Sequence, residues 1–397
     1  MATSSQRGIV LTPEERLARR RLILNDTVSL LILLLITVAL FVCTWLLHRS
    51  FIDHQALLGA RWKARGVADL NAGKPGPAIE SLRSALAYVP DRDTEIDLAT
   101  ALAQAGRTQE AFAYFNTLRE SAPGDGMINL QLARLAAKQG NVPLAILRYQ
   151  SSLDGTWQGN GYERHREVRL EMAGYLIAQH QYDKARAQLL IAASNAPTDD
   201  LAALLQIADM LEQAQDLPDA LNLYRSIAAR RVPPVPALEG AGRAAFYLGR
   251  YRVAAAYLGR ELGNPKSKSL PQDAIAGDRK MLDTANRVLM LYPASDLPAR
   301  VRAQRVLAGK NLAHARLTAC AMTQPASTKL APLVSRWTQI PQQITLYQLE
   351  QNPDLNQTIL RLEYDTETVT AQVCGAPTGD DTILLRIAQN PGAVEQE

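Results

Sequence analysis

Residues 61–90 read RWKARGVADLNAGKPGPAIESLRSALAYVP, and this stretch decides the fold. It holds two runs with apolar residues at helical spacing, separated by a turn at Gly73. Ala78 and Leu82 lie in the second run, which stops at Pro90. Proline ends a helix because it lacks the N–H and clashes with the preceding turn. The stretch therefore predicts two antiparallel helices joined by a short turn.

The pattern recurs along the chain at intervals of 33, 34, 40, 35 and 34 residues. The small residue that anchors each copy is Ala78, Ala111, Ala145, Ala185, Ala220 or Ala254. Five residues earlier lies a turn position, at Gly73, Gly106, Gly140, His180, Gln215 and Gly249. Four residues later lies a larger apolar side chain, at Leu82, Phe115, Tyr149, Leu189, Tyr224 and Leu258. One helix pair cannot bury its apolar face, but stacked pairs can. Six copies at nearly constant spacing therefore favour a repeat array over an ordinary amphipathic bundle.

On these residues the chain resembles the tetratricopeptide-repeat family. That family's pattern has Trp and Gly on a first helix, Ala, an aromatic residue and Ala on a second, and then Pro. Trp62 and Gly66 take the first-helix places in the first repeat, and Gly242 does so in the sixth. The resemblance covers about residues 59–265. It implies an all-α fold, a tetratricopeptide-like α-solenoid followed by a carboxy-terminal helical extension.

Residues 27–47 read TVSLLILLLITVALFVCTWLL, which is 21 residues without a charge. At about 1.5 Å per residue this run can cross a hydrocarbon core of roughly 30 Å. A buried core helix and a cleaved signal peptide are the alternatives. The run is longer than the apolar region of a signal peptide and follows a long amino-terminal segment. It therefore predicts one retained transmembrane helix at the amino-terminal end.

The arginines beside this run predict its orientation. The dense cluster at 19–21 precedes the span, whereas the basic residues after it are sparser. This favours a cytoplasmic amino terminus. The predicted parts are a cytoplasmic segment at 1–26, the transmembrane helix at 27–47, a juxtamembrane linker at 48–58, an array of about six repeats at 59–265 and a helical region at 266–397. The architecture looks like that of single-pass proteins of the bacterial inner membrane with a periplasmic tetratricopeptide domain.

Three features outside the regular pattern leave alternatives open. The interval of 40 residues marks an inserted, glycine-rich loop, whose Trp157 and Tyr162 either contact a partner or fold back on the array. Residues 359–374 have helical spacing, but their threonines and valines leave a β-hairpin as an alternative. If this part is exported, Cys320 and Cys374 can form a disulfide that pins the final helices to the preceding pair. The alternative is two unpaired buried thiols, which holds if this part is cytoplasmic.

No residue set in the sequence points to catalysis, a cofactor or a metal. The net charge of +4 is small for 397 residues and does not suggest a nucleic-acid protein. The five histidines are scattered, and the three cysteines contain no CxxC pair. Phosphate-binding glycine motifs are absent from the sequence. We therefore expect no catalytic, cofactor-binding or metal-binding residues, and no enzyme.

The resemblance implies a protein-binding surface. Tetratricopeptide arrays commonly bind partners on the concave face, which the first helices line. The residues at those places are Lys63, Asn71, Arg134, Lys138, Asp209, Gln213, Arg243 and Tyr247. Val67 and Asp97 stand where the family's clamp for acidic chaperone tails needs Asn, so we do not expect that ligand. The later repeats are rich in arginine, which leaves open a partner with acidic segments or a merely solvated face.

Together these observations predict a membrane-anchored scaffold that binds other proteins. Its partners would be subunits of an envelope membrane complex, which the scaffold assembles or stabilises as an accessory subunit. One alternative is an array that faces the cytoplasm and acts as an adaptor or regulator. Another is an enzyme with its active site in residues 266–397, against which the shortage of His, Cys and clustered acids argues.

Overall fold

A computed structural model describes residues 13–269, 271–341 and 343–392, and these residues form helices and no strands. The predicted all-α fold is confirmed. Residues 1–12 of the expected cytoplasmic segment lie outside the described residues. The chain divides into two compact units, residues 1–157 and 158–397.

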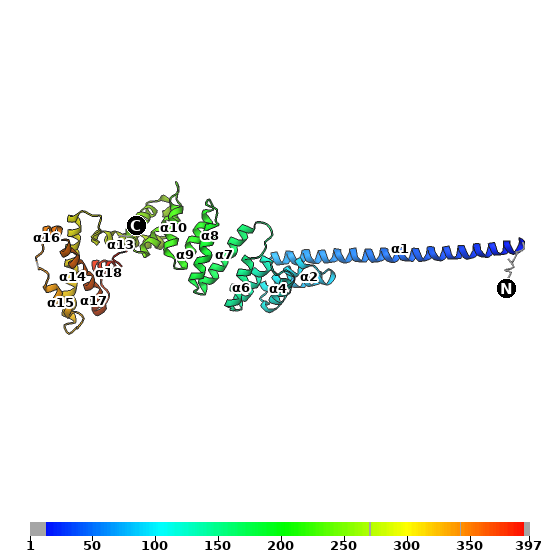
Figure 1. Cartoon of the computed structure of the whole chain (residues 1–397), viewed down its shortest axis with the longest axis horizontal. Coiled ribbons are helices and arrows are strands. Elements are labelled where there is room, and N and C mark those ends of the chain that lie inside the picture. The colour runs from blue at the N-terminus through cyan, green and yellow to red at the C-terminus, as the bar shows by residue number, and fades with distance from the viewer. Residues whose placement is uncertain (1–12, 270, 342, 393–397) are drawn as a thin grey trace, which may run out of the picture. The chain divides into compact units, whose positions relative to one another are not determined.

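The first unit contains three helix pairs, of which the first begins in an unusually long helix (Figure 1). Its helices are α1 (Pro13–Asn71), α2 (Pro75–Tyr88), α3 (Arg92–Gln104), α4 (Thr108–Ser121), α5 (Gly126–Lys138) and α6 (Val142–Leu153). Helix α1 runs for 59 residues, and its carboxy-terminal end packs on α2. Residues 48–58, for which we expected a linker, are therefore helical. One helix contains both the apolar stretch and the first helix of the array.

The second unit contains three more pairs and a carboxy-terminal group of helices. The pairs are formed by α7 (Gly161–Ala178), α8 (Tyr182–Ser194), α9 (Leu201–Gln213), α10 (Leu217–Ala228), α11 (Val235–Tyr247) and α12 (Tyr251–Leu262). After a 3₁₀ turn at Pro265–Ser269 come α13 (Gln272–Leu291), α14 (Ala299–Thr323), α15 (Ala331–Thr338), α16 (Leu346–Gln351), α17 (Pro353–Cys374) and α18 (Asp380–Gln389).

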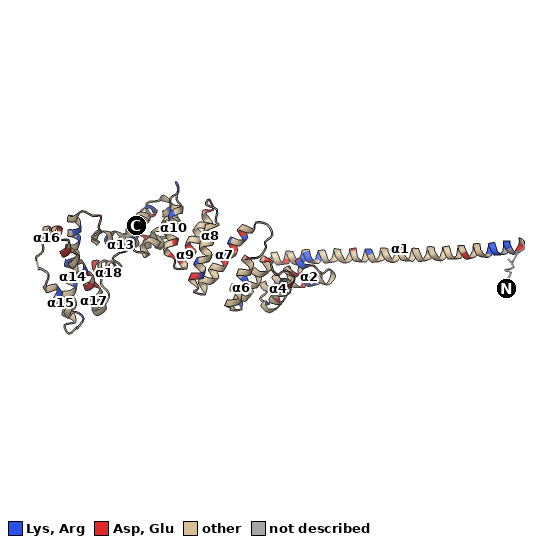
Figure 2. Ribbon diagram, viewed as in Figure 1, with Lys and Arg blue, Asp and Glu red and all other residues tan. Residues whose placement is uncertain are grey.

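The apolar stretch of α1 is exposed along its length. Leu35 is 67% exposed and Phe41 is 71% exposed. Figure 2 shows a middle part of α1 almost without charged residues, preceded by a group of basic residues near its start. Among the described residues, α1 is the one helix long and apolar enough to cross a membrane. Length and composition alone support this, and they would also fit a signal sequence.

The small and large positions of the repeat pack as the sequence predicts. All six anchoring alanines are fully buried, and the larger side chains four residues later are at most 3% exposed. A Cβ atom built at Gly66 would lie 2.6 Å from Cγ of Leu82, and one at Gly242 would lie 2.6 Å from Cγ of Leu258. Glycine is needed at these two places because the second helix comes too close for any side chain.

The six turn positions share one backbone conformation. Their φ angles are 69° at Gly73, 77° at Gly106, 72° at Gly140, 56° at His180, 61° at Gln215 and 76° at Gly249. This left-handed conformation is free of strain for glycine and costs most other residues energy. Spacing therefore located the turns even in the fourth and fifth repeats, where the residues themselves are not turn formers.

Helix α17 is continuous, so the alternative of a β-hairpin at 359–374 is wrong. Asn352 caps its amino terminus by accepting a hydrogen bond from the N–H of Leu355 at 3.0 Å. Ile359, Leu362 and Thr366 are buried at spacings of three and four on the side of α17 that packs against other helices, α14 among them. Burial of one helical face outweighs the strand propensity of the threonines.

A disulfide joins two of the carboxy-terminal helices, and one of these helices carries two buried glutamates. Cys320 of α14 and Cys374 of α17 form a disulfide, with Cα atoms 5.9 Å apart. Glu363 and Glu367, one turn apart on α17, are 1% and 0% exposed. Burial, together with the charge of Asp381, raises the pKa of Glu367 to about 7, although Arg316 lies 3.4 Å from its carboxylate. This carboxylate is therefore held at an energetic cost when it ionises.

Candidate binding surface

In the first unit, ion pairs connect successive first helices of the array. Nζ of Lys63 on α1 lies 2.6 Å from the carboxylate of Asp91, which caps the amino terminus of α3. The hydrogen bond from Lys63, and a second from Thr94, lower the pKa of Asp91 to about 2. Lys63, which the resemblance implied as a partner-binding residue, is thus already paired inside the array.

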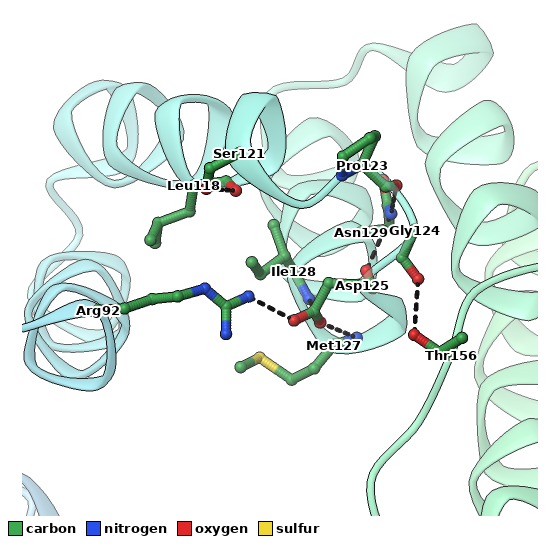
Figure 3. Close-up of polar contacts among 10 residues, drawn as sticks. All are labelled: Arg92, Leu118, Ser121, Pro123, Gly124, Asp125, Met127, Ile128, Asn129 and Thr156. Atoms are coloured by element: carbon green, nitrogen blue, oxygen red, sulfur yellow. Dashed lines mark hydrogen bonds and ion pairs between the residues drawn. The ribbon is translucent and has the colours of Figure 1, made fainter.

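The next pair of first helices repeats this arrangement (Figure 3). Arg92 at the start of α3 donates to Asp125 at 2.7 Å, and Asp125 also accepts hydrogen bonds from the N–H groups of Met127 and Ile128 at 3.0 and 3.1 Å. In the second unit, Arg166 of α7 lies 3.3 Å from Asp200, the capping residue of α9. In each case one aspartate both caps a first helix and binds the cation of the preceding one.

The inserted loop contacts the first unit through backbone and indole. The N–H of Thr156 donates to the carbonyl of Gly124 at 2.8 Å, and the N–H of Gly126 donates to the carbonyl of Thr156 at 3.0 Å. Nε1 of Trp157 donates to the carbonyl of Ser152 at 3.0 Å, and its indole occupies the space where a side chain at 126 would stand. Of the two predicted loop contacts, Trp157 therefore lies against the array, whereas Tyr162 is 90% exposed.

The predicted partner-binding residues of the first unit do not form one pocket. Lys63 and Asn71 line a hollow of about 500 Å³ on α1, whose other lining residues are small apolar ones such as Ala64. Arg134 and Lys138 are exposed one turn apart on α5. They are accessible, but the hollow on α1 does not include them.

Three of the four predicted residues of the second unit do come together. Asp209 and Gln213 of α9 and Arg243 of α11 line one pocket of about 570 Å³. Its other lining residues are Glu212, Pro236 and Glu239. Tyr247 follows Arg243 by one turn on α11 and is 63% exposed, outside the lining.

An internal network organises this pocket, which we call the α9–α11 pocket. Nε and Nη2 of Arg243 donate to the two carboxylate oxygens of Glu212 at 2.8 and 2.9 Å, and Nη1 donates to Glu239 at 2.9 Å. The bonds to Glu212 are the main cause of the raised pKa of Arg243. The hydroxyl of Tyr224, a fully buried residue, donates to Asp209. Burial and this bond raise the pKa of Tyr224.

A further carboxyl group does not line the pocket but lies close enough to interact with the charges of Glu239 and Arg243. Asp278 of α13 is 4% exposed, and its Oδ2 has no hydrogen-bond partner among the described residues. Burial, and next the charge of Glu239, raise the pKa of Asp278 to about 6, while Arg243 acts in the opposite direction. Sequence reasoning missed Glu212, Glu239 and Asp278. It noticed Tyr224 only as a large apolar side chain, although a buried hydroxyl needs a hydrogen-bond partner.

The arginines of the later repeats are largely engaged within the array. Arg252 pairs with Asp296 at 3.0 Å, Arg260 donates to the carbonyl of Ala228 at 3.4 Å, and Arg230 donates to the carbonyl of Thr198. The arginine content of the sequence therefore does not make the α9–α11 pocket basic. Within the described residues, no group of three or more His, Cys, Asp or Glu side chains is arranged to hold a metal ion.

Comparison with known proteins agrees with the repeat geometry. The family model described as tetratricopeptide repeat matches residues 63–126, 96–160 and 170–236. The chain therefore contains tetratricopeptide repeats. The predicted resemblance is thus confirmed, and the fold is one that typically serves as a non-catalytic scaffold for protein–protein interaction.

Several solved structures are similar to part of this chain. MamA is 15% identical, with 48% of this chain and 95% of that chain covered and a TM-score of 0.36. PilF of Pseudomonas aeruginosa is 15% identical, with 57% and 99% covered and a TM-score of 0.38. PilW, a widely conserved type IV pilus biogenesis factor, is 17% identical, with 55% and 97% covered and a TM-score of 0.38. Likeness at this level carries no information about the partner of this chain. No curated protein matches the sequence.

Proposed function

We propose that this tetratricopeptide-repeat protein is a membrane-anchored scaffold that binds subunits of a membrane complex in the bacterial envelope. The continuity of α1 carries the proposal, because one helix contains both the uncharged stretch 27–47 and the first helix of the array. At about 1.5 Å per residue, the helical residues 48–58 span roughly 16 Å. An array held that close to a bilayer is suited to partners that are themselves in the membrane or at its surface.

In this proposal the amino terminus is cytoplasmic and the array is periplasmic, in the inner membrane. The arginines at 19–21 support this orientation. The disulfide between Cys320 and Cys374 supports it independently, because disulfides persist in oxidising compartments and are rare in the cytosol. A cytoplasmic array would instead leave these two cysteines reduced.

The orientation is tested by fusing alkaline phosphatase or green fluorescent protein to the carboxy terminus. We expect phosphatase activity and no fluorescence. The protein should also stay in the membrane fraction after carbonate extraction. In a Cys43→Ala background, Cys320 and Cys374 should react with a maleimide only after reduction. Fluorescent fusions with freely reactive thiols would replace this proposal with the cytoplasm-facing adaptor.

Partner binding is tested by site-specific photo-crosslinking in cells. A photoreactive residue at Gln213 or Tyr247, both exposed on first helices, should give the same crosslinked protein. The same residue at Asp199, exposed in the turn before α9, is the matched control and should not. Gentle solubilisation followed by affinity capture would then identify the partner. Equal labelling from all three positions, or none from any, would contradict binding through this face.

A further inference from the structure

The α9–α11 pocket is negatively charged, although it lies in an arginine-rich region of the sequence. Its lining contains the carboxylates of Asp209, Glu212 and Glu239 and the single cation Arg243. Three negative groups against one positive group leave a net charge of −2 at neutral pH. We infer that this pocket receives a lysine or arginine side chain from a basic segment of the partner. The inference deepens the proposed function and rests on it.

Arg243 offers little to an anionic ligand because most of its guanidinium donors are already engaged. Three of its five N–H donors point at Glu212 and Glu239, at 2.8 to 2.9 Å. An incoming carboxylate would be limited to the two remaining donors and would lie among three carboxylates. An incoming cation meets no such obstacle, since each carboxylate has about four lone-pair positions.

The orientation of Asp209 adds a fixed acceptor to the pocket. The hydroxyl of Tyr224, which is fully buried, donates to Asp209 and lies 3.4 Å from Glu212. Asp209 is held by this bond while remaining exposed on α9. A carboxylate held in advance loses little conformational entropy when it accepts a hydrogen bond from a ligand.

A buried carboxyl group strengthens the case independently of the lining residues. Asp278 is 4% exposed, keeps an oxygen without a hydrogen-bond partner among the described residues, and lies close enough to Glu239 and Arg243 to feel their charges. A buried, unpaired polar atom is costly unless a partner satisfies it. A cation bound in the α9–α11 pocket would offset this negative charge, whereas an anion would increase it.

The surroundings of the pocket fit a long cationic side chain. Gln213 and Pro236 complete the lining, and Tyr247 stands exposed one turn beyond Arg243. Lysine and arginine carry an aliphatic stem that packs on apolar surface while the charged head reaches polar groups. The aromatic ring of Tyr247 offers such a surface, so a basic residue can approach the carboxylates along α11.

The test uses random 12-residue peptide display against the full-length chain in nanodiscs, with empty nanodiscs subtracted. We expect the selected peptides to be enriched in lysine or arginine at one position. The affinity of the best peptide, measured by fluorescence polarisation, should fall about tenfold in Asp209→Asn and in Glu239→Gln, the loss expected for one charge-assisted hydrogen bond. Gln213→Lys should weaken binding at least as much. Asp199→Asn, which removes an exposed carboxylate outside the pocket, should leave affinity unchanged.

The outcomes separate this inference from the proposed function. The inference would be overturned if the selected peptides were acidic or uncharged. It would also be overturned if a basic peptide bound all three pocket variants as tightly as the original chain. Either result would leave the proposal of a protein-binding array intact. If no peptide is selected above empty nanodiscs, both the inference and binding by this array are refuted. Far-UV circular dichroism of each variant is the folding control, and we expect unchanged helix content.

Discussion

Gly242 and Gly259 offer a direct test of how closely the helices of one repeat pack. Gly242 lies on α11, where a Cβ would be 2.6 Å from Cγ and 2.7 Å from Cδ2 of Leu258 on α12. Gly259 is the next residue on α12, and a Cβ there would meet nothing within 4 Å. The same substitution therefore creates a clash at one position and none at the other.

The two substitutions should change the free energy of unfolding in opposite directions. Alanine in place of glycine gains up to about 1 kcal/mol of helix propensity at both positions. Gly259→Ala should therefore stabilise the repeat by up to about 1 kcal/mol. Gly242→Ala adds an overpacking cost of about 1–3 kcal/mol, so its net effect should be a loss of about 1 kcal/mol. The difference between the two variants isolates the cost of the close approach.

A double-mutant cycle with Leu258 sharpens the test. Leu258 is fully buried, and Leu258→Ala alone should cost about 2–5 kcal/mol. When Gly242→Ala is added, the new methyl group enters the space that Leu258 has vacated. The double variant should therefore be more stable than the sum of the single effects by roughly 1 kcal/mol or more.

Hydrogen exchange followed by mass spectrometry is the appropriate assay, because repeat arrays open in parts and a single melting temperature averages them. Peptides from α11 and α12 report the equilibrium constant for local opening. A change of 1.4 kcal/mol in stability changes this constant about tenfold. Peptides from α3 and α4 serve as the internal reference. If Gly242→Ala slowed exchange as much as Gly259→Ala does, the glycine would not be required by packing and the reasoning would fail.

Three further predictions concern turns, caps and pH. His180→Gly and Gln215→Gly should each stabilise the array by about 0.5–1 kcal/mol in hydrogen exchange, since glycine relieves the left-handed strain; a loss would contradict that strain. Asp125→Ala should cost about 1–2 kcal/mol by the same assay, because the cap of α5 is lost, and a neutral effect would show that the cap contributes nothing. Glu367 has a folded pKa of about 7 against an ordinary 4.5, so its contribution is present below pH 4.5 and is lost as pH rises through 7. This contribution of Glu367 amounts to up to roughly 3 kcal/mol between pH 4.5 and 8. Glu367→Gln should therefore reduce the pH dependence in chemical denaturation and leave the part due to Glu363, whose pKa burial also raises.

The helix pairs could be predicted from sequence because their determinants recur at a fixed spacing. A small residue, a larger apolar one and a turn position each act on neighbours within the same repeat. His180 and Gln215 show the strength of this argument, since spacing alone located turns that their side chains do not favour. The continuous helix at 353–374 could not be predicted as firmly, because its apolar spacing is helical whereas its threonines and valines favour strands. Burial of one face against other helices decides for the helix.

The α9–α11 pocket could be predicted only in part. Positions carried over from the family indicated Asp209, Gln213 and Arg243, but not the two glutamates that hold Arg243. Glu212 lies 31 residues from Arg243 in sequence, and which of the intervening side chains reaches the guanidinium depends on how α9 and α11 pack. Counting arginines along the later repeats indicated a basic face, whereas the charge available to a ligand depends on which groups remain after internal pairing.

Packing and binding are connected through two consecutive residues of α11. Gly242 lets this helix approach α12, and Arg243 extends to Glu212 on α9, so the two contacts fix α11 on both sides. An outward shift of α11 by a few tenths of an ångström would lengthen the bonds of Arg243 and loosen the spacing of the carboxylates. Gly242→Ala should therefore lower the affinity for a basic peptide as well as the stability of the repeat, although residue 242 does not line the pocket. Gly259→Ala, which stabilises without moving α11, should leave that affinity unchanged, and this contrast distinguishes displaced geometry from a general change in stability.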